Sequence, residues 1–414
     1  MTGNEIKALD AAYVMQTYAR FDAVIDHGEG ATLYSPEGKV YIDFTSGIGV
    51  NSIGYGNKKW VDAISAQAMK LQHISNLYYS EPYVKLAKEL MSRTGMKNVF
   101  FANAGGEANE GMIKLARKYS FDKYGSDRST IISLEQSFHG RTITTLAATG
   151  QDAFHNYFFP FTEGFEHTPA NDIKALEMLL DTSAKAVMSD GTSAIQLIPP
   201  SDGICAILVE LIQGEGGVLP LDPAYIKAVA KLCADRDLLL LIDEVQTGVG
   251  RTGTLFAFQQ YGIKPDVVSF AKGIAGGIPM GGIMASEKCS AVLAAGTHAT
   301  TFGGNPVAAA GALEVLAQLN DAALAEVVKK GEYITEKIKA WNMPVVAEVR
   351  GKGLMIGISL SGAVLKEAAV ACVEKGLLIL TAGSDALRML PPLTITYDEI
   401  DIGLAILKAV LGGI

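Results

Sequence analysis

The sequence has few cysteines and no pattern that would pair them. Its 414 residues include four, and none has the C-x-x-C spacing of a redox motif or zinc site. A handful of unpatterned cysteines is typical of buried, reduced thiols in the cytoplasm rather than of a disulfide framework. We therefore expect a cytoplasmic protein whose cysteines are free. They are Cys205, Cys233, Cys289 and Cys372.

Long apolar runs and excess positive charge are also missing. No uninterrupted stretch approaches the roughly 18 residues that a membrane span needs, and the first residues, MTGNEIKALDAAYVMQ, lack the apolar core of a signal peptide. The 35 basic residues are outnumbered by 44 acidic ones, which gives a net charge of −9. Nucleic-acid binding requires a basic face. We expect neither a membrane nor a nucleic-acid partner.

What the sequence does contain is a regular alternation of short apolar runs and helical patterns from about residue 60 onward. Such alternation indicates a largely parallel sheet covered by helices on both faces. A hairpin pattern, ATLYSPEGKVYIDF, precedes it, and helices followed by short strands come after it. We predict an α/β fold with three parts: an N-terminal segment over 1–60 that joins the small domain, a large domain over 61–304, and a small α+β domain over 305–414.

Residues that could bind a ligand or take part in catalysis follow five of the apolar runs. NVFF leads into NAGGEANE, STIISLE into QSFHGRT, AILVELI into QGEGG, DLLLLI into DEVQTG, and DVVSFA into Lys272. Ligands of parallel sheets bind beyond the carboxyl ends of the strands. The five strand ends are therefore expected to meet in one site.

Each of these motifs also has an ordinary structural interpretation when it is taken alone. The glycine pair of NAGGEANE offers free N–H groups to a phosphate at a helix start, or it simply makes a turn. Asp243 is a half-buried carboxylate in need of a cation, or part of a solvated acidic turn. Arg141 suits a planar carboxylate, or lies free on the surface. No histidine or cysteine near Asp243 has ligand spacing, so a metal is the least favoured option.

Lys272 lies in SFAKGIAGGIPMGG, among apolar and small residues that let other atoms come close. Burial lowers the pKa of a lysine, and the neutral amine is the form that makes Schiff bases with carbonyls. Alone, a lysine that extends from the core edge to solvent is the more common case. Together, a phosphate cup, an aromatic platform, a carboxylate and such a lysine are the four groups that pyridoxal 5'-phosphate requires.

The order of these motifs resembles the class III pyridoxal-phosphate-dependent aminotransferases of fold type I, which have the aspartate aminotransferase-like architecture. The resemblance covers nearly the whole chain, and within the family it is greatest to the acetylornithine aminotransferases. It is carried by DFTSGIGVNSIGYG, HISNLYYSEP, FFANAGGEANEGMIKLARKY, SFHGRT, VELIQGEGGV, LLLIDEVQTGVGRTG, FAKGIAGGIPMGG, TTFGGNP and LRMLPPLTIT.

For the cofactor, the resemblance implies that Lys272 forms the Schiff base and that Asp243 pairs with the pyridinium nitrogen. Val245 and Phe138 would lie against the two faces of the ring, with Gln246 near the phenolic oxygen.

The phosphate would be held by the backbone amides of Gly105 and Gly106. Thr301 would reach the phosphate of the neighbouring subunit's cofactor, which implies a homodimer with shared active sites.

For the substrates, the resemblance implies that Arg141 binds the carboxylate far from the reacting carbon. Arg388 would bind the α-carboxylate of glutamate or 2-oxoglutarate, and Glu215 would pair with Arg388 when the donor has no carboxylate there. Ile48 stands where ornithine aminotransferases carry a tyrosine that helps to hold a free α-amino group, and an apolar residue suits an acylated amine.

The implied reaction converts N2-acetylornithine and 2-oxoglutarate to N-acetylglutamate 5-semialdehyde and glutamate, a step of arginine biosynthesis. Ornithine, succinylornithine and 4-aminobutyrate aminotransferases are the alternatives, followed by an aminomutase or decarboxylase on the same fold. From another class, a catalytically silent protein that binds pyridoxal phosphate is also open.

Three features depart from the family pattern. The phosphate loop usually reads serine-glycine-alanine, whereas here it is Ala104-Gly105-Gly106. The missing hydroxyl removes a hydrogen bond of about 0.5–1.5 kcal/mol, so cofactor affinity is expected to be lower. Leu211 replaces a proline, and the segment over 186–205 is longer than usual, by default a surface excursion.

Overall fold

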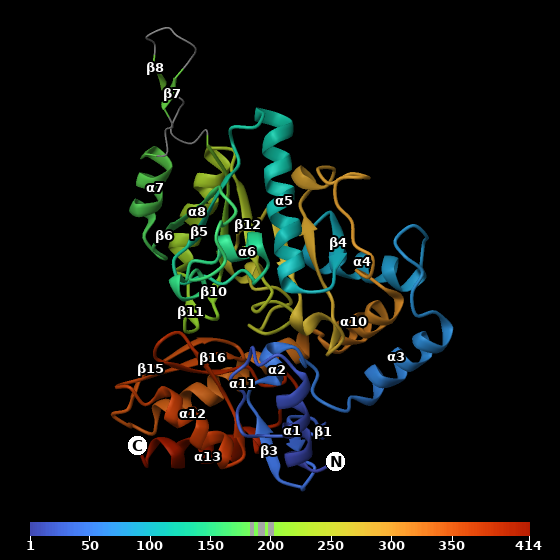
Figure 1. Ribbon diagram of the computed structural model, residues 1–414, viewed down its shortest axis with the longest axis vertical. Helices are drawn as coiled ribbons and strands as arrows, with labels where there is room; N and C mark the ends of the chain where they lie inside the picture. Colours follow the sequence, from blue (N-terminus) through green and yellow to red (C-terminus); the bar gives the residue numbers. More distant parts are fainter. Residues whose placement is uncertain (183–185, 189–194, 198–202) are drawn as a thin grey trace.

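The computed structural model describes residues 1–182, 186–188, 195–197 and 203–414. Figure 1 shows an elongated molecule, with a large sheet and its helices at one end and strands from both ends of the chain at the other. One hydrophobic core runs through both parts, because Ile207 of the large sheet, Ile358 of a smaller sheet and Phe44 near the N-terminus belong to the same buried cluster. The two parts are therefore packed together rather than merely tethered.

The large sheet has seven strands in the order β4-β14-β13-β12-β9-β5-β6. Its neighbours pair in parallel, apart from β14, which is antiparallel to both β13 and β4. All residues of β9, β12 and β13 are buried, which explains their continuous apolar sequences. The strands are β4 (Asn98–Ala102), β5 (Thr130–Leu134), β6 (Phe165–Thr168), β9 (Ile204–Glu210), β12 (Leu239–Asp243), β13 (Val267–Phe270) and β14 (Gly281–Ala285).

This sheet confirms the predicted α/β fold and the predicted meeting of the five strand ends. β4 and β13 are each antiparallel to β14, so β4, β13, β12, β9 and β5 all run in one direction. The sequence interpretation did not identify β6 or β14. The β14 sequence, GGIMA, begins with two glycines, which disfavour a strand assignment.

Helices cover the sheet and connect its strands. In α4 the spacing of Leu86 and Leu90 places both on the buried face, and Gly95 ends the helix at a φ of 71°, where a residue without a Cβ is favoured. α10 packs against both α3 and α4. The helices are α3 (Lys58–Lys70), α4 (Glu81–Thr94), α5 (Gly105–Tyr124), α6 (Ile143–Ala148), α7 (Ile173–Thr182), α8 (Pro223–Asp235), α9 (Phe258–Tyr261) and α10 (Pro306–Gln318).

The other end of the molecule combines N-terminal and C-terminal strands. The expected hairpin is present as β2 and β3, and β3 pairs in parallel with β17 near the C-terminus, with Ile42 opposite Leu377. A second, antiparallel sheet has the order β15-β16-β19-β18. The strands are β1 (His27–Glu29), β2 (Thr32–Tyr34), β3 (Val40–Asp43), β15 (Val346–Lys352), β16 (Met355–Leu360), β17 (Leu377–Leu378), β18 (Leu380–Ala382) and β19 (Ala386–Met389).

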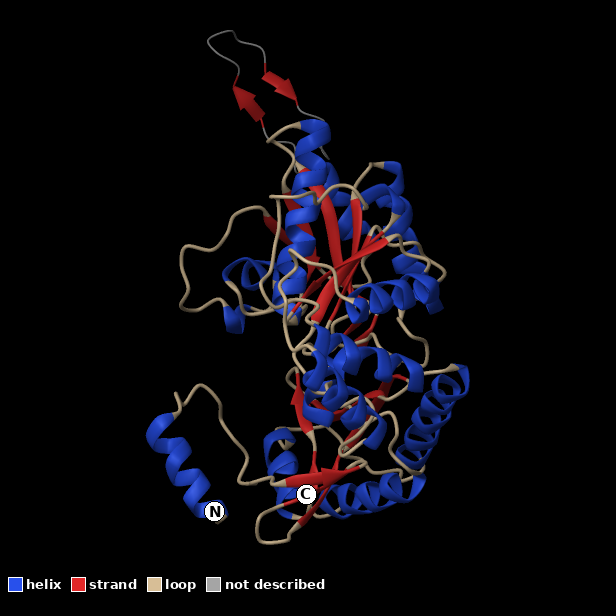
Figure 2. Cartoon of the chain, turned by 90° about the vertical axis from the view of Figure 1, so that its right-hand side faces the viewer, coloured by secondary structure: helices blue, strands red, loops and turns tan. Residues whose placement is uncertain are grey.

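Three helices cover these sheets, and they lie close to the expected positions: α11 (Asp321–Lys339), α12 (Leu365–Glu374) and α13 (Tyr397–Leu411). α2 (Ser46–Gly49) is a short turn whose residues Gly47 and Ile48 have left-handed dihedrals. The N-terminal helix α1 (Gly3–Tyr13) lies beside the body of the molecule in Figure 2. Within the described residues no single helix is long and apolar enough to cross a membrane. Of the described helices, only α10 and α11 taken together, with a bend of 73° between them, have the length and composition of a span.

The long segment over 186–205 falls largely outside the described residues. Within it, β7 (Ala186–Met188) and β8 (Ile195–Leu197) form an antiparallel pair.

Candidate active site

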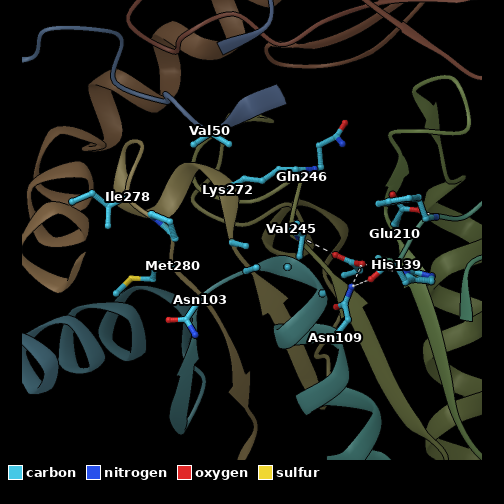
Figure 3. A pocket seen from close by; sticks show the side chains of 18 of the residues that line it. Val50, Asn103, Asn109, His139, Glu210, Val245, Gln246, Lys272, Ile278 and Met280 are labelled. Atoms are coloured by element: carbon cyan, nitrogen blue, oxygen red, sulfur yellow. Dashed lines mark hydrogen bonds and ion pairs between the residues drawn. The ribbon is translucent and has the colours of Figure 1, made fainter. Parts of the chain in front are cut away.

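A cavity of about 370 Å³ opens at the carboxyl ends of the sheet strands, a size typical of small-ligand sites. Figure 3 shows side chains from several of these strand ends pointing toward it. Seven of the predicted cofactor-binding residues line it: Gly105, Gly106, Phe138, Asp243, Val245, Gln246 and Lys272.

Lys272 follows β13 by two residues and begins a short 3-10 turn, η2 (Lys272–Ala275), that closes one side of the cavity. Its φ is 47°, a left-handed value that few non-glycine residues adopt. The side chain is half-buried. Burial lowers the pKa of Lys272, and the Glu215 and Asp243 carboxylates oppose this shift only in part. The amine is thus less readily protonated than that of an exposed lysine.

Asp243, the last residue of β12, is a buried carboxylate in a dense network. Asn109 Nδ2 donates to its Oδ2 at 2.7 Å, His139 Nδ1 lies 2.8 Å from the same oxygen, and the Val245 N–H donates to Oδ1 at 3.0 Å. Asn109 also donates to the His139 carbonyl at 2.7 Å. Figure 3 shows Asn109 and His139 on one side of the cavity. The carboxylate is therefore fixed in place.

Asn109 and His139 were not predicted to take part in the site. Asn109 lies one helical turn after Gly105 on α5, a spacing that could have placed it on the cavity face. The neighbour of Asp243 in space is His139, 104 positions away in the sequence, so no local pattern could connect them. His139 Nε2 and Asn109 Oδ1 are buried without a protein partner in the described residues, as expected of a wall that faces a ligand.

The start of α5 carries Gly105 and Gly106, the residues predicted to bind a phosphate, and both line the cavity. Its N-cap residue, Ala104, makes no side-chain hydrogen bond, which leaves the N–H groups of the first turn to other acceptors at the positive helix end. A Cβ on Gly105 would lie 2.7 Å from Val245 Cγ1. Only glycine fits there without displacing a residue of the cavity wall.

Glu210, at the end of β9, holds two neighbouring loops. It accepts the Phe138 N–H at 2.9 Å and the Gly214 N–H at 3.3 Å. Burial, reinforced by the Asp243 carboxylate, raises the pKa of Glu210. This carboxyl group therefore sets the position of the aromatic wall relative to the QGEGG loop.

Arg388, on β19, forms an ion pair with Glu215 beside the cavity. Its Nη1 donates to Glu215 Oε1 at 2.6 Å and to Gln246 Oε1 at 3.2 Å. The Arg388 side chain is almost fully buried, and its Nε has no partner in the described residues. Burial acts to raise the pKa of Glu215, but the charge and hydrogen bond of Arg388 outweigh it, so that pKa is lowered. Glu215 is therefore ionised at neutral pH.

Arg251 of the DEVQTGVGRTG loop is a fully buried arginine that joins three segments. It donates to the carbonyls of Leu354 and Pro391, and its Nη2 lies 3.4 Å from Ser46 Oγ. Ser46 in turn donates to the Leu390 carbonyl at 2.6 Å. Burial lowers the pKa of Arg251 to about 9. The loop that contacts the cavity is thereby fastened to the strand end that carries Arg388.

Five predicted residues are outside the cavity lining: Arg388 and Glu215, which lie beside it, and Arg141, Thr301 and Ile48. Arg141 is exposed, with its Cζ 4.5 Å from the Phe154 ring centroid. Thr301 is exposed and lines a separate hollow with Tyr79. Ile48 is 42% exposed and has a φ of 64°.

The glycines around Lys272 have two different structural roles. Gly277 lines the cavity, as expected of residues that leave room for other atoms. A Cβ on Gly282 would lie 2.4 Å from the Phe100 carbonyl oxygen, and one on Gly281 would lie 2.8 Å from that of Ala104. These two glycines allow β14 to pack closely against β4 and its loop. No group of three or more potential metal ligands was found within the described residues.

The family model of the class III aminotransferases matches residues 13–411 of this chain. The chain therefore belongs to the class III aminotransferase family, and it is an aminotransferase that depends on pyridoxal 5'-phosphate. The predictions of family, enzyme class and cofactor are confirmed.

Two relatives are similar over nearly their whole length. An acetylornithine aminotransferase from Haemophilus ducreyi is 50% identical over 412 residues, 99% of each chain. A second, from Caldanaerobacter subterraneus, is 45% identical over 97% of this chain and 98% of the relative.

Solved structures confirm the fold. An N-acetylornithine aminotransferase from Stenotrophomonas maltophilia superposes with a TM-score of 0.81 at 33% identity, covering 98% of each chain. An ornithine aminotransferase from Toxoplasma gondii, described with partial occupancy of pyridoxal phosphate at its active site, superposes with a TM-score of 0.90 at 29% identity, covering 99% of this chain and 94% of that one.

Proposed function

We propose that this aminotransferase transfers the δ-amino group of N2-acetylornithine to 2-oxoglutarate, giving N-acetylglutamate 5-semialdehyde and glutamate. The observation that carries the donor assignment is the 50% identity to an acetylornithine aminotransferase across both chains. The Glu215–Arg388 ion pair supports it, because N-acetylornithine brings no carboxylate to Arg388 and the pair can therefore stay intact.

The cavity fits pyridoxal phosphate. Lys272 would hold its aldehyde carbon, Asp243 its pyridine nitrogen, and Val245 and Phe138 its two faces, while Gly105 and Gly106 would bind the phosphate through their amides. Gln246 would lie near the phenolic oxygen. When bound, this cofactor supplies an electron sink for the negative charge that develops at the substrate carbon.

The chain's own residues then move the protons. The lowered pKa of Lys272 makes its Nζ available as a base that would remove the proton from the substrate carbon. The same group would return the proton later in the half-reaction. Asp243 would keep a proton on the pyridine nitrogen of the bound cofactor, and its contacts with Asn109 and His139 fix the orientation of this carboxylate. The apolar side chains of Val245 and Phe138, which line the cavity, would limit the access of water to the reacting atoms.

Glu215 and Arg388 would switch between the two half-reactions. With N-acetylornithine the pair stays closed, because an unpaired buried arginine beside an apolar carbon chain would cost several kcal/mol. With glutamate or 2-oxoglutarate the substrate carboxylate takes the place of Glu215. Arg141 would bind the distal carboxylate of both substrates, and exposed Ile48 would lie against the acylated end of the donor.

A homodimer in the cytoplasm is part of this proposal. Thr301 lies on an exposed apolar surface and away from the cavity of its own chain, as expected if it serves a partner's cofactor. Asn76 Nδ2 donates to the Thr300 and Gly303 carbonyls at 3.2 and 3.0 Å, so the two loops of this surface are tied together. We call it the Thr301 surface, and it contains Leu77, Tyr78, Tyr79, Thr301 and Phe302.

The donor assignment is tested by a panel of half-reactions. The cofactor-loaded protein is mixed separately with N-acetylornithine, N-succinylornithine, ornithine and 4-aminobutyrate, and the loss of its visible absorbance is timed. N-acetylornithine is expected to react with the highest kcat/KM. If 4-aminobutyrate or ornithine is preferred, the assignment is wrong.

The second candidate is an ornithine aminotransferase, which the Toxoplasma gondii structure favours by fold alone. Ile48 argues against it, because its side chain offers no hydrogen bond to a free α-amino group. An Ile48→Tyr variant should gain activity toward ornithine. A silent cofactor-binding protein would keep its colour with every donor of the panel.

A further inference from the structure

Arg141 is unusual among the nine arginines because no hydrogen bond or ion pair joins it to an oxygen atom of the described residues. The eight others each donate to a carboxylate or a backbone carbonyl. The printed contacts of Arg141 are with two aromatic rings: its Cζ lies 4.5 Å from the Phe154 centroid and 5.7 Å from that of Phe138. Its donors are therefore free.

Phe154 joins this arginine to the cavity wall. It is a half-buried residue at the end of η1 (Asp152–Phe154), and its ring meets the Phe138 ring edge-on, with centroids 5.7 Å apart and planes 68° apart. Phe138 lines the cavity. A guanidinium held over an aromatic face keeps its in-plane N–H groups available for a planar carboxylate.

The surrounding backbone is fixed, so the Arg141 side chain is the adaptable part. The His139 N–H donates to Thr149 Oγ1 at 3.0 Å, next to the Asn109 bond to the same residue's carbonyl. On the other loop, the His155 N–H donates to the Asp152 carbonyl at 3.0 Å, and His155 Nε2 lies 2.9 Å from the Leu146 carbonyl. Phe154 therefore has a defined position from which to hold a long, flexible side chain.

We propose that Phe154 is a positioning residue for substrate binding: its ring holds the Arg141 guanidinium at the cavity mouth, ready for the distal carboxylate. The inference rests on the proposed role of Arg141. The stack restricts the rotamers of Arg141 before the substrate arrives, so less conformational entropy is lost on binding. Because Phe154 contacts the arginine and not the reacting atoms, it affects binding more than the chemical step.

The test compares Phe154→Leu, which removes the aromatic face, with the matched control Phe154→Tyr, which keeps it. Half-reactions are run with N-acetylornithine, with glutamate, and with N-acetyl-1,4-diaminobutane, which is the donor without its carboxylate. Phe154→Leu should raise KM for the two carboxylate donors about three- to tenfold with little change in kcat. Phe154→Tyr, and Phe154→Leu with the decarboxylated donor, should be unchanged.

A double-mutant cycle isolates the pair. In an Arg141→Ala background, Phe154→Leu should have no further effect on KM. Equal loss with all three donors, a fall in kcat without a change in KM, or full additivity in the cycle would overturn the inference. If glutamate reacts but N-acetylornithine does not, the donor assignment fails while the glutamate arm still tests Phe154. Thermal melts confirm that each variant is folded.

Discussion

Lys272 has a backbone conformation and an environment that both cost free energy. A left-handed φ on a non-glycine residue costs about 1–3 kcal/mol, and burial of its amine adds to this. β13 and β14 are hydrogen-bonded to each other on either side of this reversal, so the chain has little freedom to relax there. Such stored strain is typical of reactive positions.

The lowered pKa of Lys272 predicts how the stability of the apoprotein depends on pH. Because the pKa of Lys272 is lowered from its usual 10.5, the unfolded chain binds more protons than the folded one between the two pKa values, so stability rises with pH there. Without cofactor, Lys272→Met should therefore be more stable than the wild type at pH 7, and this advantage should shrink as the pH approaches 10.5. Urea unfolding at several pH values measures it. An advantage independent of pH would contradict the prediction.

The proposed phosphate site at the start of α5 predicts unequal effects for its two adjacent glycines. Gly105→Ala would bring a Cβ within 2.7 Å of Val245, whereas at Gly106 the nearest atom, of Thr142, is 3.4 Å away. Overpacking of this kind costs about 1–3 kcal/mol, so Gly105→Ala should weaken cofactor binding at least about fivefold. Gly106→Ala, the matched control, should bind as well as the wild type. Absorbance titration with pyridoxal phosphate separates the two, and equal losses would argue against the steric cause.

At the scale of elements, α5 lacks the N-cap hydrogen bond that a serine would make. Ala104→Ser should stabilise the apoprotein by about 1 kcal/mol, because its hydroxyl can accept an N–H of the first turn. The same hydroxyl can donate to the phosphate, so cofactor affinity should rise as well. Denaturation and cofactor titration measure the two effects, and an unchanged protein in both would show that this position is already satisfied.

The elements also show what could be predicted from the sequence. Asp243 and Lys272 could be placed at the cavity because they lie at or just beyond the ends of short apolar strands, and the ends of parallel strands converge. The contacts of Asp243 with Asn109 and His139 were missed, because they depend on how α5 and the SFHGRT loop pack. The stacking of Arg141 on Phe154 was missed for the same reason, since the two residues come from different loops.

β14 was missed for another reason. Its strand is set by pairing with β13 and β4 on both sides, and its two glycines are required by close packing rather than by strand propensity. The roles assigned to the site residues, and the domain boundaries at 60 and 304, stay predictions.

At the scale of the whole molecule, the Thr301 surface is the proposed dimer interface. Leu77 is 86% exposed, Tyr79 101% and Phe302 60%, and contiguous exposed apolar side chains are typical of interfaces. Leu77→Asp should shift the protein toward monomers in sedimentation velocity and weaken cofactor binding, because Thr301 would then be withdrawn from the partner's site. Ile402→Asp, at a 52% exposed position on α13, is the control. A dimer unaffected by Leu77→Asp would place the interface elsewhere.

Arg251 couples the local unfolding of the three segments that it joins. Its hydrogen bonds reach the carbonyls of Leu354 and Pro391 and the hydroxyl of Ser46, so none of these segments can separate without exposing a buried cation. In hydrogen exchange, the amides of Leu354 and Leu390, bonded to the Arg251 and Phe44 carbonyls, should therefore exchange in one cooperative opening event. Arg251→Met should let them exchange at separate rates. A residue that does not contact the substrate would then control when these segments open, as well as where they lie.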